Sequence, residues 1–319
     1  MITRKQRVRQ AYQHGEELSV NSKRYQRTLQ TYIDSFLEQD TEDVGDITYR
    51  SLFNGEQGKS IIEMKQPGII AGVEETKYIM ELFKIGYQNG TLDGEEVKEG
   101  QAVLRKEGKL EDILTTERLG LNILQRMSGI ATRTRELADI AGRYGCQIAA
   151  TRKTDLGLID KKAAYIGGAL THRLGLYDAV MIKDTHIDQL ARQNDHSTQD
   201  AITEAVQKCY EQNPEARFIE VEVRDKEQAL LAAKTYHKLA KRPGQEFIIM
   251  LDNFSPEEIT ETIKELKEKH LYNTALLEAS GGINEKNLEN YARTGIDVVS
   301  MGTLTSEVDK LDIHEVCLN

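Results

Sequence analysis

From Gly145 onward, short apolar runs alternate with helical patterns, and this alternation constrains the fold of the 319-residue chain more than any other feature. Repeated strand–helix units with continuously apolar strands indicate a parallel sheet that is covered on both faces. About six such units in about 170 residues favour an α/β barrel over an open sheet. A dinucleotide-binding sheet would carry G-x-G-x-x-G after its first strand, and the sequence lacks that motif. The predicted strands span residues 146–151, 179–182, 218–223, 247–251, 276–279 and 298–301.

The preceding part of the chain has a different texture. Residues 31–143 mix helical periodicity, short strands such as 60–64, glycine turns and a long helical pattern over 116–143. Residues 1–30 are polar and basic and show no clear apolar face, so we predict a solvated or partner-contacting helix there. We therefore predict an N-terminal extension over 1–30, a mixed α/β domain over 31–143 and a barrel domain over 144–319.

Composition excludes several classes of protein. A net charge of −10 argues against bulk binding of nucleic acid. No stretch approaches the roughly 20 apolar residues of a membrane span, and the N-terminus lacks the apolar core of a signal peptide. The three cysteines are widely spaced and form neither a disulfide framework nor a zinc pattern, so we expect a cytoplasmic protein.

Charged or small residues follow or close every predicted strand of the barrel. In a parallel barrel all strand-to-helix loops open at the C-terminal ends of the strands, so these residues are expected to share one rim. Packing alone does not explain such a set. Its members are Arg152, Lys153, Lys183, Glu222, Asp252, Ser280, Gly281, Gly282 and Gly302.

The cations of this set predict an anionic small-molecule ligand, because an acidic protein has no general reason to gather them. The guanidinium groups of Arg152 and Arg173 match carboxylate or phosphate. Lys153 and Lys183 are point charges that suit a leaving group that becomes negative. Beside Arg173, the imidazole of His172 can donate a hydrogen bond or titrate.

The carboxylates and glycines complement the cations. Glu220 and Glu222 share a strand face, and Asp252 closes the next strand, where carboxylates can hold Mg²⁺ or bind sugar hydroxyls. The alternative for these carboxylates is ion pairing with the neighbouring cations. The turn at 280–282 precedes a predicted helix over 284–293 and can bring backbone N–H groups to a phosphate. The residues thus predict a phosphorylated substrate, with Mg²⁺, and a second, anionic substrate.

Nine short motifs occur in a fixed order along the chain. They are ERLGLN (117–122), QRMSGIAT (125–132), TRKT (151–154), HR (172–173), IKD (182–184), EVEV (220–223), LDN (251–253), EASGGI (278–283) and SMG (300–302). Together they resemble the quinolinate phosphoribosyltransferase family, also called nicotinate-nucleotide pyrophosphorylase (carboxylating). The similarity runs from about Asp43 to the C-terminus.

The resemblance implies an N-terminal α/β sandwich, a C-terminal open α/β barrel and a homodimer whose active site uses both subunits. It implies phosphoribosyl transfer from phosphoribosyl pyrophosphate to quinolinate with loss of CO₂, a step of NAD biosynthesis that uses Mg²⁺. The pyridine dicarboxylate would be bound by Arg118 of the partner subunit together with Arg152, Arg173 and Lys183.

The same resemblance assigns the remaining roles. Lys153 and His172 would hold phosphoribosyl pyrophosphate and the departing pyrophosphate. Glu222 and Asp252 would contact the ribose hydroxyls and Mg²⁺, and with Lys153 and Lys183 they form the implied catalytic set. The phosphate would be bound by Ser280, Gly281, Gly282 and Gly302.

One segment departs from the family pattern and keeps alternatives open. Asp155-Leu156-Gly157-Leu158-Ile159 stands where the family has a neutral residue and a further arginine. A relative of the same fold that acts on another heteroaromatic acid, such as those associated with molybdenum transport, is therefore an alternative. Other classes are a Schiff-base aldolase or lyase that uses Lys153 or Lys183, and a non-catalytic binding module.

Overall fold

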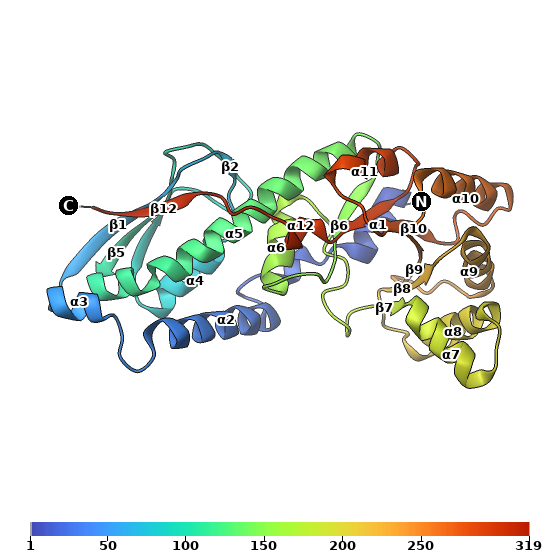
Figure 1. Ribbon diagram of the computed structural model, residues 1–319, viewed down its shortest axis with the longest axis horizontal. Helices are drawn as coiled ribbons and strands as arrows, with labels where there is room; N and C mark the ends of the chain where they lie inside the picture. The colour runs from blue at the N-terminus through green and yellow to red at the C-terminus, as the bar shows by residue number, and fades with distance from the viewer. Residues whose placement is uncertain (1, 319) are drawn as a thin grey trace. The chain divides into compact units, whose positions relative to one another are not determined.

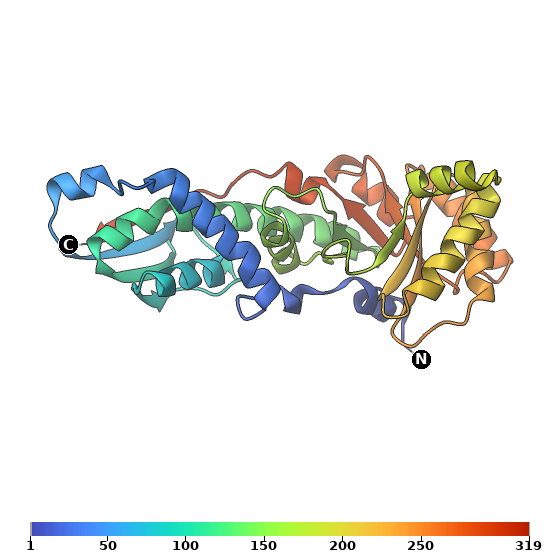
Figure 2. The ribbon, with the colours of Figure 1, turned by 90° about the horizontal axis from the view of Figure 1, so that it is seen from below.

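A computed structural model describes residues 2–318, which form two compact units (Figures 1 and 2). Unit 1 contains the chain through His14 together with Leu137–Arg152 and Leu170–Gly302. Unit 2 contains Gly15–Glu136, Lys153–Ala169 and the chain from Thr303. The domain boundaries predicted from the sequence stay a prediction, because compact units are not the same as independently folding domains.

Unit 1 is built on a six-stranded parallel sheet, and every predicted strand is present. In β9, apolar residues 247–251 are buried on both faces, which accounts for the continuous apolar run in the sequence. The predicted α/β class with a barrel-type parallel sheet is confirmed. The strands in spatial order are β6 (Gln147–Ala150), β11 (Val298–Met301), β10 (Leu276–Ser280), β9 (Glu246–Asp252), β8 (Phe218–Val223) and β7 (Val180–Ile182).

Helices between the strands cover the outer face of this sheet (Figures 1 and 2). The start of α10 follows the predicted signal: the Ser255 side chain accepts from the Glu258 amide, and Pro256 occupies the first turn. Proline is tolerated there because its missing N–H would have no helical partner. The outer helices are α7 (Asp184–Asn194), α8 (Thr198–Gln212), α9 (Lys226–Lys238), α10 (Pro256–Glu268) and α11 (Glu285–Ala292).

The N-terminal helix α1 (Arg4–Tyr12) is part of the core of unit 1. Val8, Ala11 and Tyr12 are at most 1% exposed and belong to one apolar cluster with Phe218 and residues of four other strands. The prediction of a solvated or partner-contacting helix is therefore wrong for these residues. Their spacing of three and four residues is a narrow apolar face, which the surrounding charges hide in the sequence.

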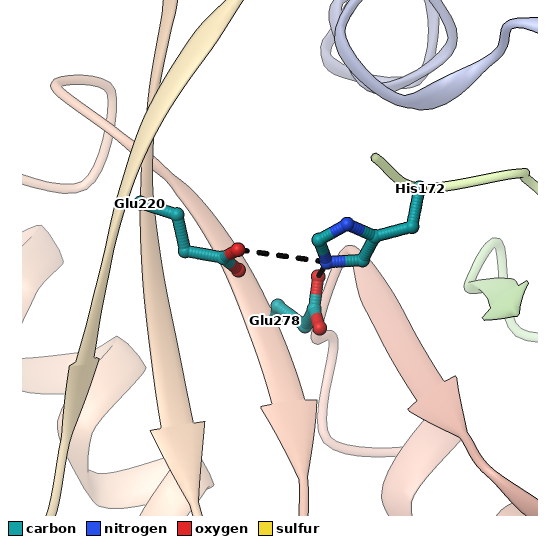
Figure 3. Close-up of side chains that lie close together, drawn as sticks. All are labelled: His172, Glu220 and Glu278. Atoms are coloured by element: carbon teal, nitrogen blue, oxygen red, sulfur yellow. Dashed lines mark ion pairs between the residues drawn. The ribbon is translucent and has the colours of Figure 1, made fainter. Parts of the chain in front are cut away.

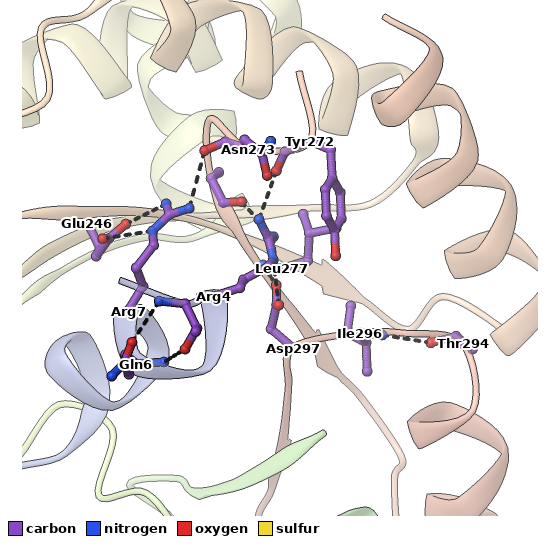
Figure 4. A network of polar contacts seen from close by, with 12 residues as sticks. Arg4, Gln6, Arg7, Glu246, Tyr272, Asn273, Leu277, Thr294, Ile296 and Asp297 are labelled. Carbon is purple, nitrogen blue, oxygen red and sulfur yellow. Dashed lines mark hydrogen bonds and ion pairs between the residues drawn. The ribbon is translucent and has the colours of Figure 1, made fainter. Parts of the chain in front are cut away.

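Two arginines fix α1 beneath the strands (Figure 4). Arg4 Nε lies 2.5 Å from Asp297 Oδ1 and Arg4 Nη2 lies 2.7 Å from Asp297 Oδ2. Arg7 Nη2 lies 2.8 Å from Glu246 Oε2. Because Asp297 precedes β11 and Glu246 begins β9, the helix closes the N-terminal ends of the strands. Arg4 and Arg7 thus serve packing within the unit.

Unit 2 contains a four-stranded antiparallel sheet in the order β12-β1-β5-β3, together with the two-stranded pair β2–β4. The last strand of the chain pairs with the first strand of the sheet, Ile313 lying opposite Met64. The long predicted helix is present and begins earlier than expected, at Leu110. The elements are η1 (Gly15–Glu17), α2 (Lys23–Thr41), α3 (Ile47–Leu52), β1 (Gln57–Met64), β2 (Gly68–Ile69), α4 (Val73–Leu82), β3 (Gly86–Asn89), β4 (Glu96–Val97), β5 (Ala102–Lys109), α5 (Leu110–Gly142), α6 (Leu158–Gly167), α12 (Thr303–Ser306) and β12 (Ile313–Leu318).

A buried polar network joins three helices of unit 2. Lys162 on α6 pairs with Glu74 and, at 2.5 Å, with Glu75 on α4. Tyr25 on α2 donates a hydrogen bond of 2.6 Å to Glu75 Oε1. Burial raises the pKa of Glu75, and the positive charge of Lys162 opposes this shift only in part.

Within residues 2–318, none of the helices has an apolar stretch of the length that a membrane span requires.

Candidate active site

The C-terminal ends of β9 and β10 bring two predicted site residues side by side. Asp252 is paired in register with Ser280, and the Asn253 amide donates to the Ser280 carbonyl at 2.9 Å. This position follows from parallel pairing, which aligns the ends of neighbouring strands. The carboxylate of Asp252 also accepts a 2.6 Å hydrogen bond from the side-chain amide of Asn253.

The turn after β10 depends on glycine. Gly281 and Gly282 have φ angles of +94° and +61°, which favour glycine. A Cβ atom on Gly281 would lie 2.8 Å from the backbone nitrogen of Asn253, so a side chain has no room. Helix α11 follows, capped by Asn284, which accepts from the Lys286 amide. The backbone can therefore approach an anion closely here, and the phosphate role predicted for this turn and for Gly302, directly after β11, stays a prediction.

Glu222 and Lys183 form an ion pair at the same rim. Lys183 Nζ lies 3.5 Å from Glu222 Oε2, as the ion-pair alternative predicts. Burial raises the pKa of Glu222; Lys183 opposes this shift, while Asp252 and Asp184 add to it. Asp184 is itself paired with Arg224 at 2.6 Å, and the oxygens of Glu222 and Asp252 are ligands that fit a hard cation such as Mg²⁺.

Arg173 is a nearly buried cation, with an exposed fraction of 7%. Its Nη2 contacts the Met181 sulfur at 3.2 Å, and among residues 2–318 no ion pair to a carboxylate within 4.0 Å is formed. Burial lowers the pKa of Arg173, Glu220 opposes that shift, and the neighbouring positive charge of Arg152 adds to it. Two guanidinium groups close together, without a carboxylate paired to Arg173, are suited to a ligand with carboxylates.

The His172 side chain points toward two buried glutamates, Glu220 on β8 and Glu278 on β10 (Figure 3). Its Nε2 lies 3.3 Å from Glu278 Oε2 and 3.5 Å from Glu220 Oε2. Its Nδ1 accepts the backbone N–H of Arg173 at 2.7 Å, so the ring proton is assigned to Nε2, facing the carboxylates. A metal-binding histidine uses one nitrogen as the ligand and donates from the other. The three residues are close enough to hold a metal, but this ring orientation favours hydrogen bonding to the carboxylates.

The pKa values of the two glutamates of this buried layer are shifted in opposite directions. Burial and the carboxylate of Glu278 raise the pKa of Glu220 well above its usual value. Burial opposes ionisation of Glu278, but His172, Ser300 and Tyr12 outweigh it and lower its pKa. The sequence patterns predict no role for Glu278, although Glu278 and Ser280 are two residues apart and therefore lie on one face of β10.

The remaining predicted residues lie in unit 2. Arg118 on α5 has a side chain that is 56% exposed, and its Nη2 lies 4.0 Å from Glu117. Lys153 directly follows Arg152, and its carbonyl accepts a 2.6 Å hydrogen bond from Thr305. The roles predicted for Arg118, Lys153 and His172 stay predictions.

The aspartate that departs from the family pattern has a partner of its own. Asp155 Oδ2 lies 2.9 Å from Arg126 Nη2, and Arg126 also binds the buried Asp160 at 2.7 Å. The amide of Asp155 donates to Asp160 Oδ2 at 2.9 Å. The negative charge of Asp155 is therefore offset within unit 2 by the arginine of the QRMSGIAT motif.

Comparison with known proteins assigns the class to which this fold and rim belong. Residues 46–128 match the family described as quinolinate phosphoribosyl transferase, N-terminal domain, and residues 130–315 match the C-terminal domain of the same family. The chain therefore belongs to the quinolinate phosphoribosyltransferase family.

Individual relatives agree with this assignment. A protein of Methanothermobacter thermautotrophicus named probable nicotinate-nucleotide pyrophosphorylase (carboxylating) is 38% identical over 278 residues, or 85% of this chain and 93% of that protein. Quinolinate phosphoribosyltransferase (decarboxylating) 1b of Nicotiana tabacum is 33% identical, over 89% of this chain and 81% of that protein. The structure of NadC from Streptococcus pyogenes matches with a TM-score of 0.76 and 31% identity, over 93% of this chain and 98% of that chain.

Proposed function

We infer that this protein transfers the phosphoribosyl group of phosphoribosyl pyrophosphate to quinolinate, giving nicotinate mononucleotide, pyrophosphate and CO₂ in NAD biosynthesis. The names of the relatives support this reaction. Within the chain, the observation that carries it is the nearly buried Arg173, which has Arg152 as a neighbour and lacks a carboxylate ion pair among the described residues. A dicarboxylate supplies the missing negative charge.

The residues of unit 1 divide the work of binding. Arg173, Arg152 and Lys183 hold the carboxylates of the acid, which fixes the direction of the ring nitrogen. Glu222 and Asp252 accept hydrogen bonds from the ribose hydroxyls and are the residues that would hold Mg²⁺. The backbone N–H groups at 280–282 and at Gly302 bind phosphate.

The reaction then follows from where charge develops. The bond between the anomeric carbon and pyrophosphate breaks, and Lys153 offsets the negative charge on the leaving group. The ring nitrogen donates its electron pair to the electron-poor anomeric carbon and becomes positively charged. That charge stabilises the electron pair left on the ring when the adjacent carboxylate leaves as CO₂, and a proton from solvent completes the product. When bound, Mg²⁺ supplies further positive charge beside the pyrophosphate.

The test is an assay with phosphoribosyl pyrophosphate, Mg²⁺ and a panel of pyridine carboxylic acids. We expect nicotinate mononucleotide and CO₂ in equal amounts from quinolinate, measured by chromatography and by release of labelled CO₂. Turnover of another heteroaromatic acid without turnover of quinolinate would instead support the paralogue alternative. Borohydride inactivation in the presence of a carbonyl substrate would support the Schiff-base alternative.

We propose that Mg²⁺ is the cofactor, because Glu222 and Asp252 offer carboxylate oxygens at one rim beside the single cation Lys183, while Asp184 is paired with Arg224. Chelation with EDTA is expected to abolish turnover, and added Mg²⁺ should restore it. The Asp252→Asn variant should need a Mg²⁺ concentration at least about tenfold higher for half-maximal rate, since it removes one charged ligand. Full activity in EDTA would contradict the proposal.

We propose that the protein is a homodimer in which Arg118 reaches the partner's acid-binding site. The exposure of Arg118 and its 4.0 Å separation from Glu117 leave it accessible for such a contact. Arg118→Ala and Arg152→Ala should each be inactive alone. Mixing them should restore about one quarter of wild-type activity, because half of the dimers are mixed and each has one intact site. Absence of recovery in verified mixed dimers would contradict a shared site.

We also propose a cytoplasmic location. Cys146, Cys209 and Cys317 are all free thiols. Free cysteines are typical of proteins in reducing compartments. Fractionation of cells that express the tagged protein would test this proposal.

A further inference from the structure

Helix α1 holds the segment that carries Arg173. The Thr171 hydroxyl donates to the carbonyl of Tyr12 at 2.8 Å and accepts from the amide of His14 at 2.9 Å. Thr171 is fully buried. The Thr171 side chain therefore ties the end of α1 to the backbone directly before the His172-Arg173 pair.

The backbone at His172 is in a conformation that needs support. Its φ angle is +53°, in the left-handed region that residues other than glycine rarely adopt. The 2.7 Å hydrogen bond from the Arg173 amide to His172 Nδ1 closes this turn and fixes the ring at the same time. The direction in which the Arg173 side chain leaves the backbone depends on this turn.

Tyr12 holds the imidazole from the other side. Its hydroxyl donates to Glu278 Oε2 at 2.6 Å, the same oxygen that faces His172 Nε2. Its ring meets the His172 ring edge-on, with centroids 5.0 Å apart, and stacks on Phe218 at 5.3 Å. Tyr12 is 0% exposed, so its hydroxyl has no access to water that could replace this bond.

We propose that α1 is a positioning element of the acid-binding site. Through Thr171 and Tyr12 it fixes the left-handed turn at His172, and through that turn it fixes the guanidinium of Arg173. In the part of the chain described, no carboxylate lies within ion-pair distance of the Arg173 head group, and Glu220 acts on it only from farther away. Its position is set by the backbone and by packing, and such preorganisation lowers the entropic cost of binding. The identity of the acid rests on the proposed function, whereas the role of the helix does not depend on it.

Two conservative variants test it. Thr171→Val keeps the shape of the side chain and removes the link to α1, and Tyr12→Phe keeps the ring and removes the bond to Glu278. Each is expected to raise KM for quinolinate roughly tenfold, because each removes buried hydrogen bonds that hold the turn at His172. The KM for phosphoribosyl pyrophosphate and kcat should change less than about twofold, because the buried His172 ring faces Glu220 and Glu278 and the loops after β9 and β10 are unchanged.

Tyr25→Phe is the matched control, because Tyr25 is also a fully buried tyrosine that donates a 2.6 Å hydrogen bond to a buried glutamate, in unit 2. It should lose a similar amount of stability and leave both KM values unchanged. A rise in the KM for quinolinate in Tyr25→Phe equal to that in Tyr12→Phe would overturn the proposal, as would equal effects on both substrates.

Hydrogen exchange supplies a readout that is independent of activity. The amide of Arg173 donates to His172 Nδ1, so deuterium uptake of a peptide containing residues 171–174 reports on the turn. Uptake should be faster in Thr171→Val than in the wild type and unchanged in Tyr25→Phe. Unchanged uptake in Thr171→Val would overturn the proposal. If the wild type fails to convert quinolinate, the proposed function fails, and the exchange result still decides the role of α1.

Discussion

Replacing Arg173 by alanine is expected to raise KM for quinolinate by about 30-fold to 1000-fold, corresponding to about 2–4 kcal/mol. Arg173 is 7% exposed, so in the proposed site its charge would meet the acid in a poorly hydrated environment where a charge-assisted hydrogen bond is strong. The proposed site binds phosphoribosyl pyrophosphate at other loops, so the KM for that substrate should change little. Steady-state kinetics with each substrate varied in turn gives the measurement.

Two further variants make this result specific. Arg173→Lys should recover only part of the loss, because a single ammonium cannot form the paired hydrogen bonds of a guanidinium. Arg293→Ala removes an exposed arginine that pairs with Glu289 within the same helical region, and it should leave both KM values unchanged. Unchanged KM and kcat in Arg173→Ala would remove Arg173 from the site.

The Lys162→Met variant is expected to be destabilised by about 3–5 kcal/mol near pH 8, because it leaves a buried carboxylate without its cation. Glu75 is 0% exposed, and its other hydrogen-bond partner is the neutral hydroxyl of Tyr25. Urea unfolding of the wild type and the variant at the same pH gives the difference in free energy. Lys208→Met, which removes an exposed cation that pairs with Glu204 one turn away, should cost less than about 1 kcal/mol.

The same variant should show a defined dependence on pH. Burial raises the pKa of Glu75 in the folded protein, and loss of Lys162 removes the group that opposes this shift. A raised pKa means that the folded state binds the proton more tightly than the unfolded state does. This contribution is complete below the unfolded pKa of about 4.3 and is lost as the pH rises through the folded pKa. The destabilisation relative to wild type should therefore be smaller at pH 5 than at pH 8, and equal values would contradict this account.

The repeating units of unit 1 could be predicted because their signals are local. Strands 218–223 and 298–301 have the predicted bounds, since short segments rich in β-branched residues between polar turns favour a strand. The start of α10 was equally predictable, because serine, proline and glutamate satisfy the free N–H groups of a first turn within four residues. The burial of the N-terminal helix could not be predicted, because three apolar residues among many charges give a weak periodic signal.

The candidate site was predictable in part for the same reason. Residues at strand ends reach one rim whenever the strands are parallel, so Glu222, Asp252 and Ser280 follow from the pattern alone. Residues that act through contacts distant in sequence gave no such signal. Tyr12 and Glu278 are separated by 266 positions and meet at 2.6 Å, and nothing near either residue indicates the other.

The parallel barrel class, the rim and the kind of substrate could be predicted from the sequence, because alternation, strand-end chemistry and motif order are properties of neighbouring residues. The pairing of charges follows only from the three-dimensional arrangement. This arrangement gave Asp155 the partner Arg126, gave Lys183 the partner Glu222, and left Arg173 without a carboxylate ion pair in the described chain. It also turned a basic N-terminal segment into the support beneath Arg173. The physical reason is that pairing and burial depend on distances between residues far apart in the chain, which local patterns do not encode.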